Sequence, residues 1–282
     1  MELPKGIVLL DSLGDLQPEN SCPILVCGSH CGGNHELALH VKNCKVQAVF
    51  LNNAGIGKNQ AGIKGLSYYQ SEGILACAVD HNSAEIGISS DTWENGIISH
   101  INALAEKVGI TKGDSVQNAV AILMNNAEIL SPSQNSIQHD LSPTQDAEIQ
   151  SKQELKKQTQ IHIEGVTITV TDSITFLHEH NAGDIVVCGS HGGLSAGEYA
   201  QKYKVKAVFF NDAGIGKNNA GVQSLEILSA KGILACTVDC MTAEIFNGQD
   251  VLEHGVISVC NERAKAKNIQ KNMKVAEAIK LL

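Results

Sequence analysis

The sequence predicts an α/β protein built from two tandem homologous βα repeats, with parallel, Rossmann-like sheet strands and a pseudo-twofold relation between the repeats. One stretch occurs twice, as AVFLNNAGIGKNQAG at 48–62 and AVFFNDAGIGKNNAG at 207–221. The match also continues on both sides of this stretch. In each copy, short apolar strands alternate with helical segments, a pattern that gives parallel strands joined by right-handed crossovers.

The offset between the copies sets the predicted domains. VCGSH at 26–30 matches 187–191, and Asp11-Ser12 matches Asp172-Ser173, both at an offset of 161 residues. Farther along, GILACAVD at 73–80 matches GILACTVD at 232–239 at an offset of 159. We therefore expect one unit at 1–124 and a second at 159–282. The Ser-, Gln-, Asn- and Pro-rich segment 125–158 between them is expected to be a polar, mobile linker.

Within the second copy, strands are expected at 184–188, 205–210 and 233–238, and helices at 194–203 and 219–231. Upstream, QIHIEGVTITV is expected to form a hairpin that turns at Glu164-Gly165, where the first copy has the shorter KGIVLL. Each unit is expected to end in helices, at 94–107 and 112–124 in the first copy.

Composition excludes several classes of partner. The 282 residues carry a net charge of −9, a pI near 5.6 and only 4% aromatic residues, which argues against nucleic acid and anionic membranes. The N-terminus lacks the pattern of a signal peptide, and no apolar run approaches the roughly 18 residues of a membrane span. We therefore expect a cytoplasmic protein, with a homo-oligomer left open.

The nine cysteines include no C-x-x-C pair, and those in the strands are expected to be reduced core residues. Cys27-x-x-His30-Cys31 has the residue types of a zinc site, but the second copy keeps only Cys188-x-x-His191. No metal and no cofactor are therefore expected.

The repeated stretch combines a strand, a glycine turn and a lysine. Glycine permits positive φ and close approach of a ligand, and helix amides favour an anion. It is not a P-loop, because Asn52 and Asn211 occupy the position of the first glycine. The predicted anion ligands are Gly55, Gly57 and Lys58 in the first copy, and Gly214, Gly216 and Lys217 in the second. The alternative is a tight turn with a solvated lysine.

Polar residues at three strand ends complete the predicted site, because ligands of parallel sheets bind beyond the carboxyl ends of the strands. These residues are Ser29, His30, Asn52, Asn53, Asp80 and Glu85 in the first copy, and Ser190, His191, Asn211, Asp212, Asp239 and Glu244 in the second. All are expected to converge on one sheet edge.

The copies differ where chemistry is expected. Asn53 stands opposite Asp212, and His81 opposite Cys240. Either one unit is catalytic and the other has diverged, or a shared cleft uses Asp212 from one unit and His81 from the other.

A strand-end His-Gly followed by a strand-end Asp-Ala is similar to caspase-type peptidases, where a cysteine follows. Gly55 and Gly214 stand at that position here, so the activity is not carried over. Cys31 remains the alternative nucleophile.

The leading hypothesis is a small-molecule enzyme that performs hydrolysis, or proton transfer next to a carbonyl, on an anionic metabolite. Its acid/base candidates are His191, Asp212, His30 and His81, with Lys217 and the glycine amides holding negative charge. The rival hypothesis is a non-catalytic anion- or metabolite-binding or regulatory module that uses the same loops.

Overall fold

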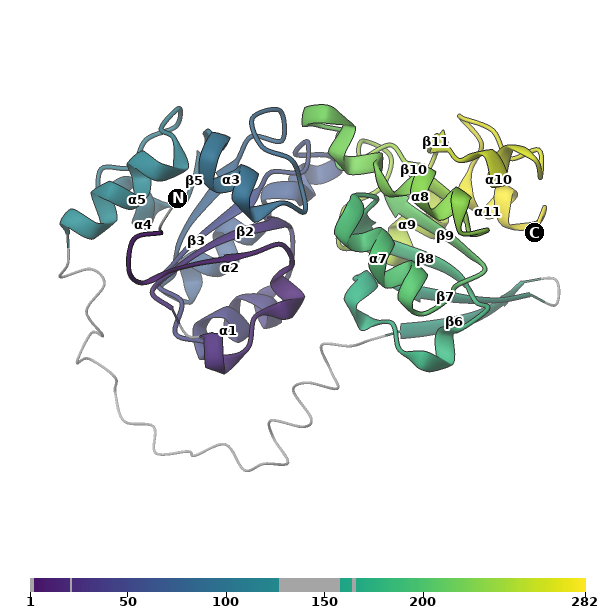
Figure 1. Ribbon diagram of the computed structural model, residues 1–282, viewed down its shortest axis with the longest axis horizontal. Helices are drawn as coiled ribbons and strands as arrows, with labels where there is room; N and C mark the ends of the chain where they lie inside the picture. Colours follow the sequence, from purple (N-terminus) through teal and green to yellow (C-terminus); the bar gives the residue numbers. More distant parts are fainter. Residues whose placement is uncertain (1–2, 21, 127–157, 164–165) are drawn as a thin grey trace, which may run out of the picture.

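The computed structural model describes residues 3–20, 22–126, 158–163 and 166–282. Two sheets of mostly parallel strands, flanked by helices, confirm an α/β fold. We call residues 3–126 the first half and residues 158–282 the second half. Figure 1 shows the first half, purple to teal, beside the second, green to yellow. In the part of the chain that the structure describes, no helix is long and apolar enough to cross a membrane.

The first half forms a five-stranded sheet in the order β1-β2-β3-β4-β5. Its strands are β1 (Ile7–Leu10), β2 (Ile24–His30), β3 (Ala48–Asn52), β4 (Leu75–Val79) and β5 (Ile98–Ile101). Its helices are α1 (His35–Asn43), α2 (Gly65–Ser71), α3 (Ser89–Asn95), α4 (Ala103–Lys107) and α5 (Val116–Asn125). Strands β1 to β4 are parallel, and β5 pairs antiparallel with β4.

The second half forms a six-stranded sheet in the order β11-β10-β9-β8-β7-β6. Its strands are β6 (Gln158–Ile163), β7 (Val166–Thr171), β8 (Ile185–His191), β9 (Ala207–Asn211), β10 (Leu234–Val238) and β11 (Ile257–Cys260). Its helices are α7 (Leu194–Lys202), α8 (Ser224–Ala230), α9 (Gly248–His254), α10 (Glu262–Lys265) and α11 (Val275–Ile279). The two outer strands β6 and β11 pair antiparallel with their neighbours.

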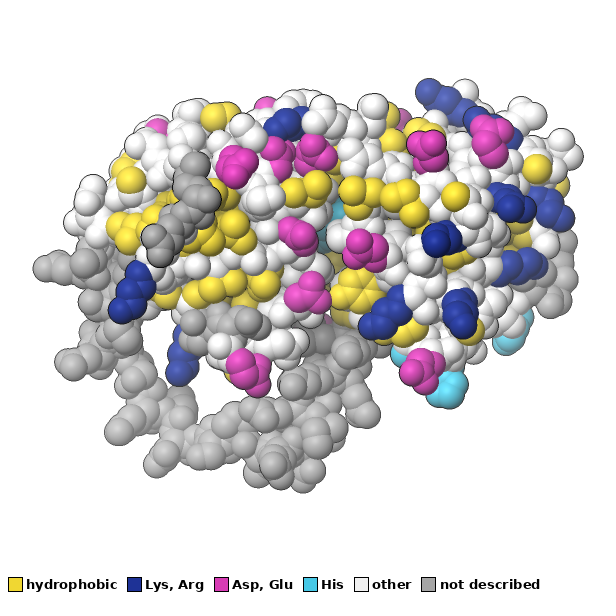
Figure 2. Space-filling model, in the orientation of Figure 1, with side chains coloured by type: hydrophobic (Ala, Val, Ile, Leu, Met, Phe, Trp, Pro, Cys, Tyr) yellow, Lys and Arg dark blue, Asp and Glu magenta, His cyan; other side chains and the backbone are white. Residues whose placement is uncertain are grey.

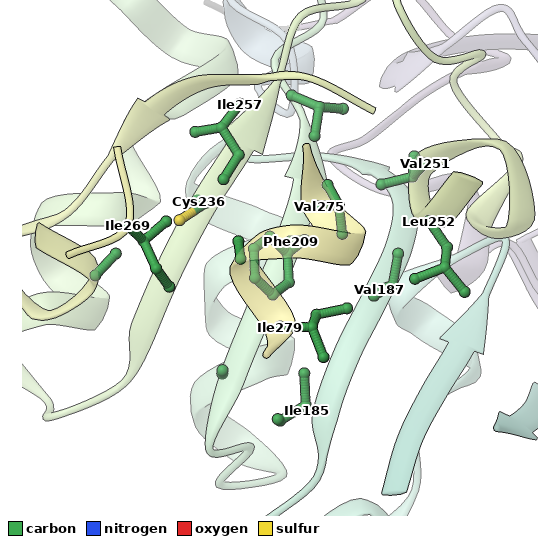
Figure 3. Close-up of a cluster of buried hydrophobic side chains, with 14 of the residues drawn as sticks. Ile185, Val187, Phe209, Cys236, Val251, Leu252, Ile257, Ile269, Val275 and Ile279 are labelled. Carbon is green, nitrogen blue, oxygen red and sulfur yellow. The ribbon is translucent and has the colours of Figure 1, made fainter. Parts of the chain in front are cut away.

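Both faces of each sheet are covered, which explains the uninterrupted apolar runs of the central strands. Every residue of β3 and β9 is buried. In the first half, α1 and α2 pack on one face, and α3, α4 and α5 on the other. Figure 3 shows one such face in the second half, where Val275 and Ile279 of α11 lie against Val187 and Phe209 of the strands.

The predicted hairpin is confirmed, because β6 and β7 pair antiparallel in continuous register. Its turn, Glu164-Gly165, lies outside the described residues. The helix predicted at 94–107 is confirmed only at its end, by α4, since α3 ends at Asn95 and β5 follows it, whereas α5 confirms the helix predicted at 112–124. The apolar residues of β5 cover the edge of β4, and this tertiary pairing overrides the helical pattern.

Two further boundaries differ. The expected helix at 219–231 begins only at Ser224, because Asn218 and Asn219 have positive φ values of 52° and 59°. Strand β8 also continues through Ser190 and His191, so these residues belong to the strand rather than to a loop. The linker prediction, 125–158, falls almost wholly outside the described residues, and the domain boundaries stay a prediction.

Candidate functional site

The repeated glycine loops lie against one another where the two halves meet. A Cβ atom placed on Gly55 would lie 2.8 Å from the Cα of Gly214, and a Cβ atom placed on Gly214 would lie 2.8 Å from the Cα of Gly55. Glycine is therefore required by backbone approach between the halves, not by approach of a ligand. An apolar cluster beside the loops takes three matched residues from each half: Ala54, Ala61, Ile86, Ala213, Ala220 and Ile245.

The amides that were expected to bind an anion are used within the protein. The Gly214 N–H donates to Asp212 Oδ1, and the Gly216 N–H donates to the carbonyl of Gly214. The Lys217 N–H crosses to the carbonyl of His81 at 2.8 Å. Gly55, Gly57 and Lys58 make the corresponding bonds to Asn53, Gly55 and Cys240. This geometry does not support the predicted anion site, because these N–H groups already have acceptors.

The lysine side chains are engaged as well. Lys217 Nζ lies 2.7 Å from Asp91 Oδ1, and Lys58 Nζ lies 2.7 Å from Asp250 Oδ1, each pair joining the two halves. Burial alone would raise the pKa of Asp91, but hydrogen bonds from Lys217, from the Glu85 amide and from Asn95 outweigh it, so this pKa is lowered. The solvated lysine of the alternative interpretation is therefore wrong as well.

The predicted glutamates join the same interface. Asn218 Nδ2 donates to Glu85 Oε1 at 2.7 Å, and Asn59 Nδ2 donates to Glu244 Oε1 at the same distance. Asn52 and Asn211 are buried and donate to the carbonyls of Ala84 and Ala243. These residues hold loops together, and none of them lines the larger pocket described below.

Asp212 and Asn53 perform the same local task. Asp212 Oδ1 accepts the N–H groups of Gly214 and Cys240. Asn53 Oδ1 accepts those of Gly55 and His81, and also lies 2.9 Å from His81 Nδ1. Burial raises the pKa of Asp212 above its usual range. Either side chain therefore closes the turn after its strand.

Beside this turn, Asp212, Asp239 and Cys240 bring possible metal-ligating atoms within 4.8 Å of one another. Asp239 Oδ1 already accepts the Met241 N–H, as Asp80 Oδ1 accepts that of Asn82. The carboxylates are thus occupied as turn acceptors, and the prediction of no metal stays a prediction.

A different set of matched residues lines a pocket of about 310 Å³ between the halves, which we call the central pocket. It contains Ser29, His30, Ser190 and His191 from the predicted site. The remaining lining residues were not predicted: Asp11, Ser12, Leu13, Gly14, Gln17, Leu37, His40, Ser173, Ile174, Thr175, Phe176, Ser195, Ala196, Tyr199 and Phe246. The volume lies at the lower end of the range for small-ligand sites.

The two serines position the loops that cover this pocket. Ser29 Oγ accepts the Leu13 N–H at 2.8 Å, and Ser190 Oγ accepts the Ile174 N–H at 3.0 Å. The repeated Asp-Ser at 11–12 and 172–173 begins these two segments, and its carboxylates bind a further loop in each half: Asp11 Oδ1 accepts the Ser89 N–H, and Asp172 Oδ1 accepts the Gly248 N–H. The duplicated Asp-Ser was thus a signal for the site in the sequence.

The two histidines are buried and uncharged at neutral pH. Burial lowers the pKa of His30 to about 4. Burial, with a smaller contribution from His30, lowers that of His191 to about 3. His191 Nδ1 accepts the Gly193 N–H at 3.1 Å, so the ring proton of the neutral form is on Nε2.

His30 differs, because its buried Nδ1 has no hydrogen-bond partner among the described residues. Within the described residues, no group bonds Nε2 of either ring. Both rings line the pocket, and His191 is suited to donating its Nε2 proton to a ligand there.

Cys31, the alternative nucleophile, does not suit that role, because it is fully buried and burial raises the pKa of its thiol to about 12. Among the described residues, the lining of the central pocket also contains no Lys or Arg. On the face shown in Figure 2, acidic side chains gather around the middle, where the halves meet. Neither feature favours an anionic ligand.

Comparisons of the chain with protein-family models, with curated proteins and with solved structures find no match.

Proposed function

We propose that the protein binds a small, neutral carbonyl compound in the central pocket and polarises its carbonyl oxygen with His30 and His191. One observation carries this proposal: two matched, buried, neutral imidazoles line the same pocket, and the Gly193 N–H on Nδ1 of His191 leaves the proton of that ring on Nε2. A neutral imidazole N–H in a water-poor site is an effective donor to a developing oxyanion.

The lining favours a mostly apolar ligand. Apolar surface comes from Leu13, Leu37, Ile174, Phe176 and Ala196, and no Lys or Arg of the described part of the chain lines the pocket. The anionic metabolite expected from the sequence is therefore replaced by a neutral one in this proposal.

The reaction best suited to this arrangement is proton transfer next to the carbonyl. Asp11 provides the carboxylate in the described lining, and it is the candidate proton acceptor. Hydrolysis through Cys31 as nucleophile is less favoured, since burial keeps this cysteine a thiol.

The non-catalytic binding module remains the second candidate, and one observation favours it. Asp11 Oδ1 already accepts the N–H and the hydroxyl of Ser89, at 2.8 and 2.6 Å. These hydrogen bonds give Asp11 a structural task at the start of α3, which a binding module needs as much as an enzyme does.

A ketone titration tests both candidates. We expect acetophenone to raise the melting temperature, since a ligand at a hundred times its Kd adds about 2.7 kcal/mol to stability. Replacement of either histidine by Phe should weaken binding several-fold, about 1 kcal/mol per hydrogen bond. Replacement by Gln, which keeps an N–H donor, should restore part of it. His100→Phe, outside the pocket, is the control.

Turnover separates the enzyme from the binding module. In D₂O, an enzyme of this kind exchanges the methyl protons of acetophenone, which NMR detects, and Asp11→Asn should slow the exchange by roughly 10² to 10⁴. Binding without exchange would support the module. Absence of binding to ketones would overturn the proposal.

We also propose that the halves are homologous repeats related by a near-twofold axis. The reciprocal contacts support it: Lys58 with Asp250 and Lys217 with Asp91, and Gly55 against Gly214. Superposition of the halves in an experimental structure would test it, and unlike strand paths would contradict it. Cytoplasmic location and a homo-oligomer stay predictions.

A further inference from the structure

Two matched positions beside the histidines carry very different side chains. Gly87 and Phe246 follow the shared Ala-Glu-Ile at 84–86 and 243–245. Their backbones are equivalent, because the Gly87 N–H donates to the Gly28 carbonyl and the Phe246 N–H donates to the Gly189 carbonyl, both at 2.7 Å. Both also have positive φ, 85° and 61°.

Phe246 is strained where Gly87 is not. A bulky aromatic residue rarely adopts positive φ, and glycine adopts it freely. The presence of a bulky residue at this strained backbone position indicates that its side chain has a role.

The ring of Phe246 stands at the His30 side of the central pocket. Its centroid lies 5.8 Å from that of His30 and 6.5 Å from that of Phe176. At the other side, a Cβ on Gly87 would lie 3.2 Å from Cε1 of His191. The part of the pocket next to His191 therefore has no side chain at the position that corresponds to the Phe246 ring next to His30.

Phe246 also separates two pockets. It lines the central pocket and a second one of about 260 Å³, here called the polar pocket, which includes Lys64, Asp172, Glu244 and Asn247. Asp11 lines the central pocket, whereas its repeat match Asp172 lines the polar pocket. Burial raises the pKa of Asp172, in keeping with its more covered position.

We propose that Phe246 is a specificity-determining residue, whose ring closes the side of the central pocket toward Asp172 and confines the ligand to the side lined by Asp11. This inference rests on the proposed function of the central pocket. It predicts that ligand length is limited by the Phe246 ring and that Asp172 makes no contact with the ligand in the natural protein.

The test uses acetophenone, propiophenone, butyrophenone and valerophenone, each one methylene longer than the last, in calorimetric titrations of the full chain. The natural protein should lose affinity along the series. Phe246→Gly should gain affinity, up to about fourfold per added methylene buried. Phe246→Leu, which keeps a bulky side chain, should behave as the natural protein.

A second comparison asks whether the two pockets join. Asp172→Asn should leave the Kd of butyrophenone unchanged in the natural protein and should change it in the Phe246→Gly background. If the natural protein binds ketones but Phe246→Gly shows the same length dependence, and Asp172→Asn has no effect in either background, the role of Phe246 is overturned while the proposed function stands. If neither protein binds any ketone, the proposed function fails, and ligand selection by Phe246 fails with it.

Discussion

At the scale of single residues, the two pocket histidines should control stability in acid. An unfolded histidine takes up a proton below about pH 6.5, whereas folded His30 and His191 resist it until about pH 4 and 3. The unfolded state therefore binds more protons in this window, and the free energy of unfolding falls as the pH falls. The slope reaches up to about 1.4 kcal/mol per pH unit for each histidine.

Urea unfolding of the natural protein and of a His30→Gln/His191→Gln variant, between pH 4.5 and 7.5, measures this effect. The variant should lose much of the acid slope. Carboxylates remain the same in both proteins, so their contributions cancel. Equal slopes would show that the histidines are not held neutral.

Asp212 gives the second prediction at this scale. Asp212→Asn should leave stability within about 1 kcal/mol, because an amide oxygen can accept the same N–H groups, as Asn53 does, and Asn avoids the cost of a buried charge. Acetophenone binding should also be unchanged, since Asp212 lies outside the central pocket lining. A 10² to 10⁴ loss of turnover would instead restore the acid/base role that the sequence suggested.

At the scale of structural elements, the glycine loops can be compared with other glycines of similar φ. Gly55→Ala places a Cβ 2.8 Å from the Gly214 backbone, whereas the Cβ of Gly73→Ala has no neighbour within 4 Å among the described residues. Their φ values, 70° and 77°, impose a similar backbone strain. We expect Gly55→Ala to destabilise the protein by at least about 2 kcal/mol more than Gly73→Ala. Thermal unfolding of both would measure it, and equal losses would exclude tight contact between the loops.

The lysine pairs give a prediction for the same interface. Lys217→Ala should lower stability by about 1 to 2 kcal/mol, since the partly buried Asp91 loses its cation. A double-mutant cycle with Asp91→Ala should show coupling. Ketone binding should be unaffected. Weakened ligand binding with unchanged stability would favour the anion site instead.

Much of the fold was predictable from the sequence because apolar runs and glycine turns act locally. The strands around AVFLN and AVFFN and the hairpin at 158–171 follow from patterns within a few residues. Strand β5 could not be predicted from such local patterns, because its pairing with β4 is decided by tertiary contact. Among the residues that line the central pocket, the Ser and His of the two GSH strand ends were predicted from the sequence. The roles of Lys58 and Lys217 were missed because their partners lie more than 120 residues away in the chain, at separations of 192 and 126.

At the scale of the whole molecule, the contacts between the halves should hold them together without a continuous chain. They include the loop contact at Gly55 and Gly214, the apolar cluster around Ile86 and Ile245, and the two lysine pairs. A protease site placed between 127 and 157 tests this. After cleavage, the protein should elute from size-exclusion chromatography as one species. Separation into two fragments would show that the covalent link is required.

A tandem chain also differs from a dimer of identical subunits in its genetics. In such a dimer one codon specifies both sides of the axis, so a phenylalanine that narrows one side must narrow the other. Here separate codons specify Gly87 and Phe246. Selection can therefore change one wall of the central pocket while the other keeps its glycine. Such a pocket can evolve to fit an asymmetric ligand, which a symmetric dimer cannot do by a single substitution.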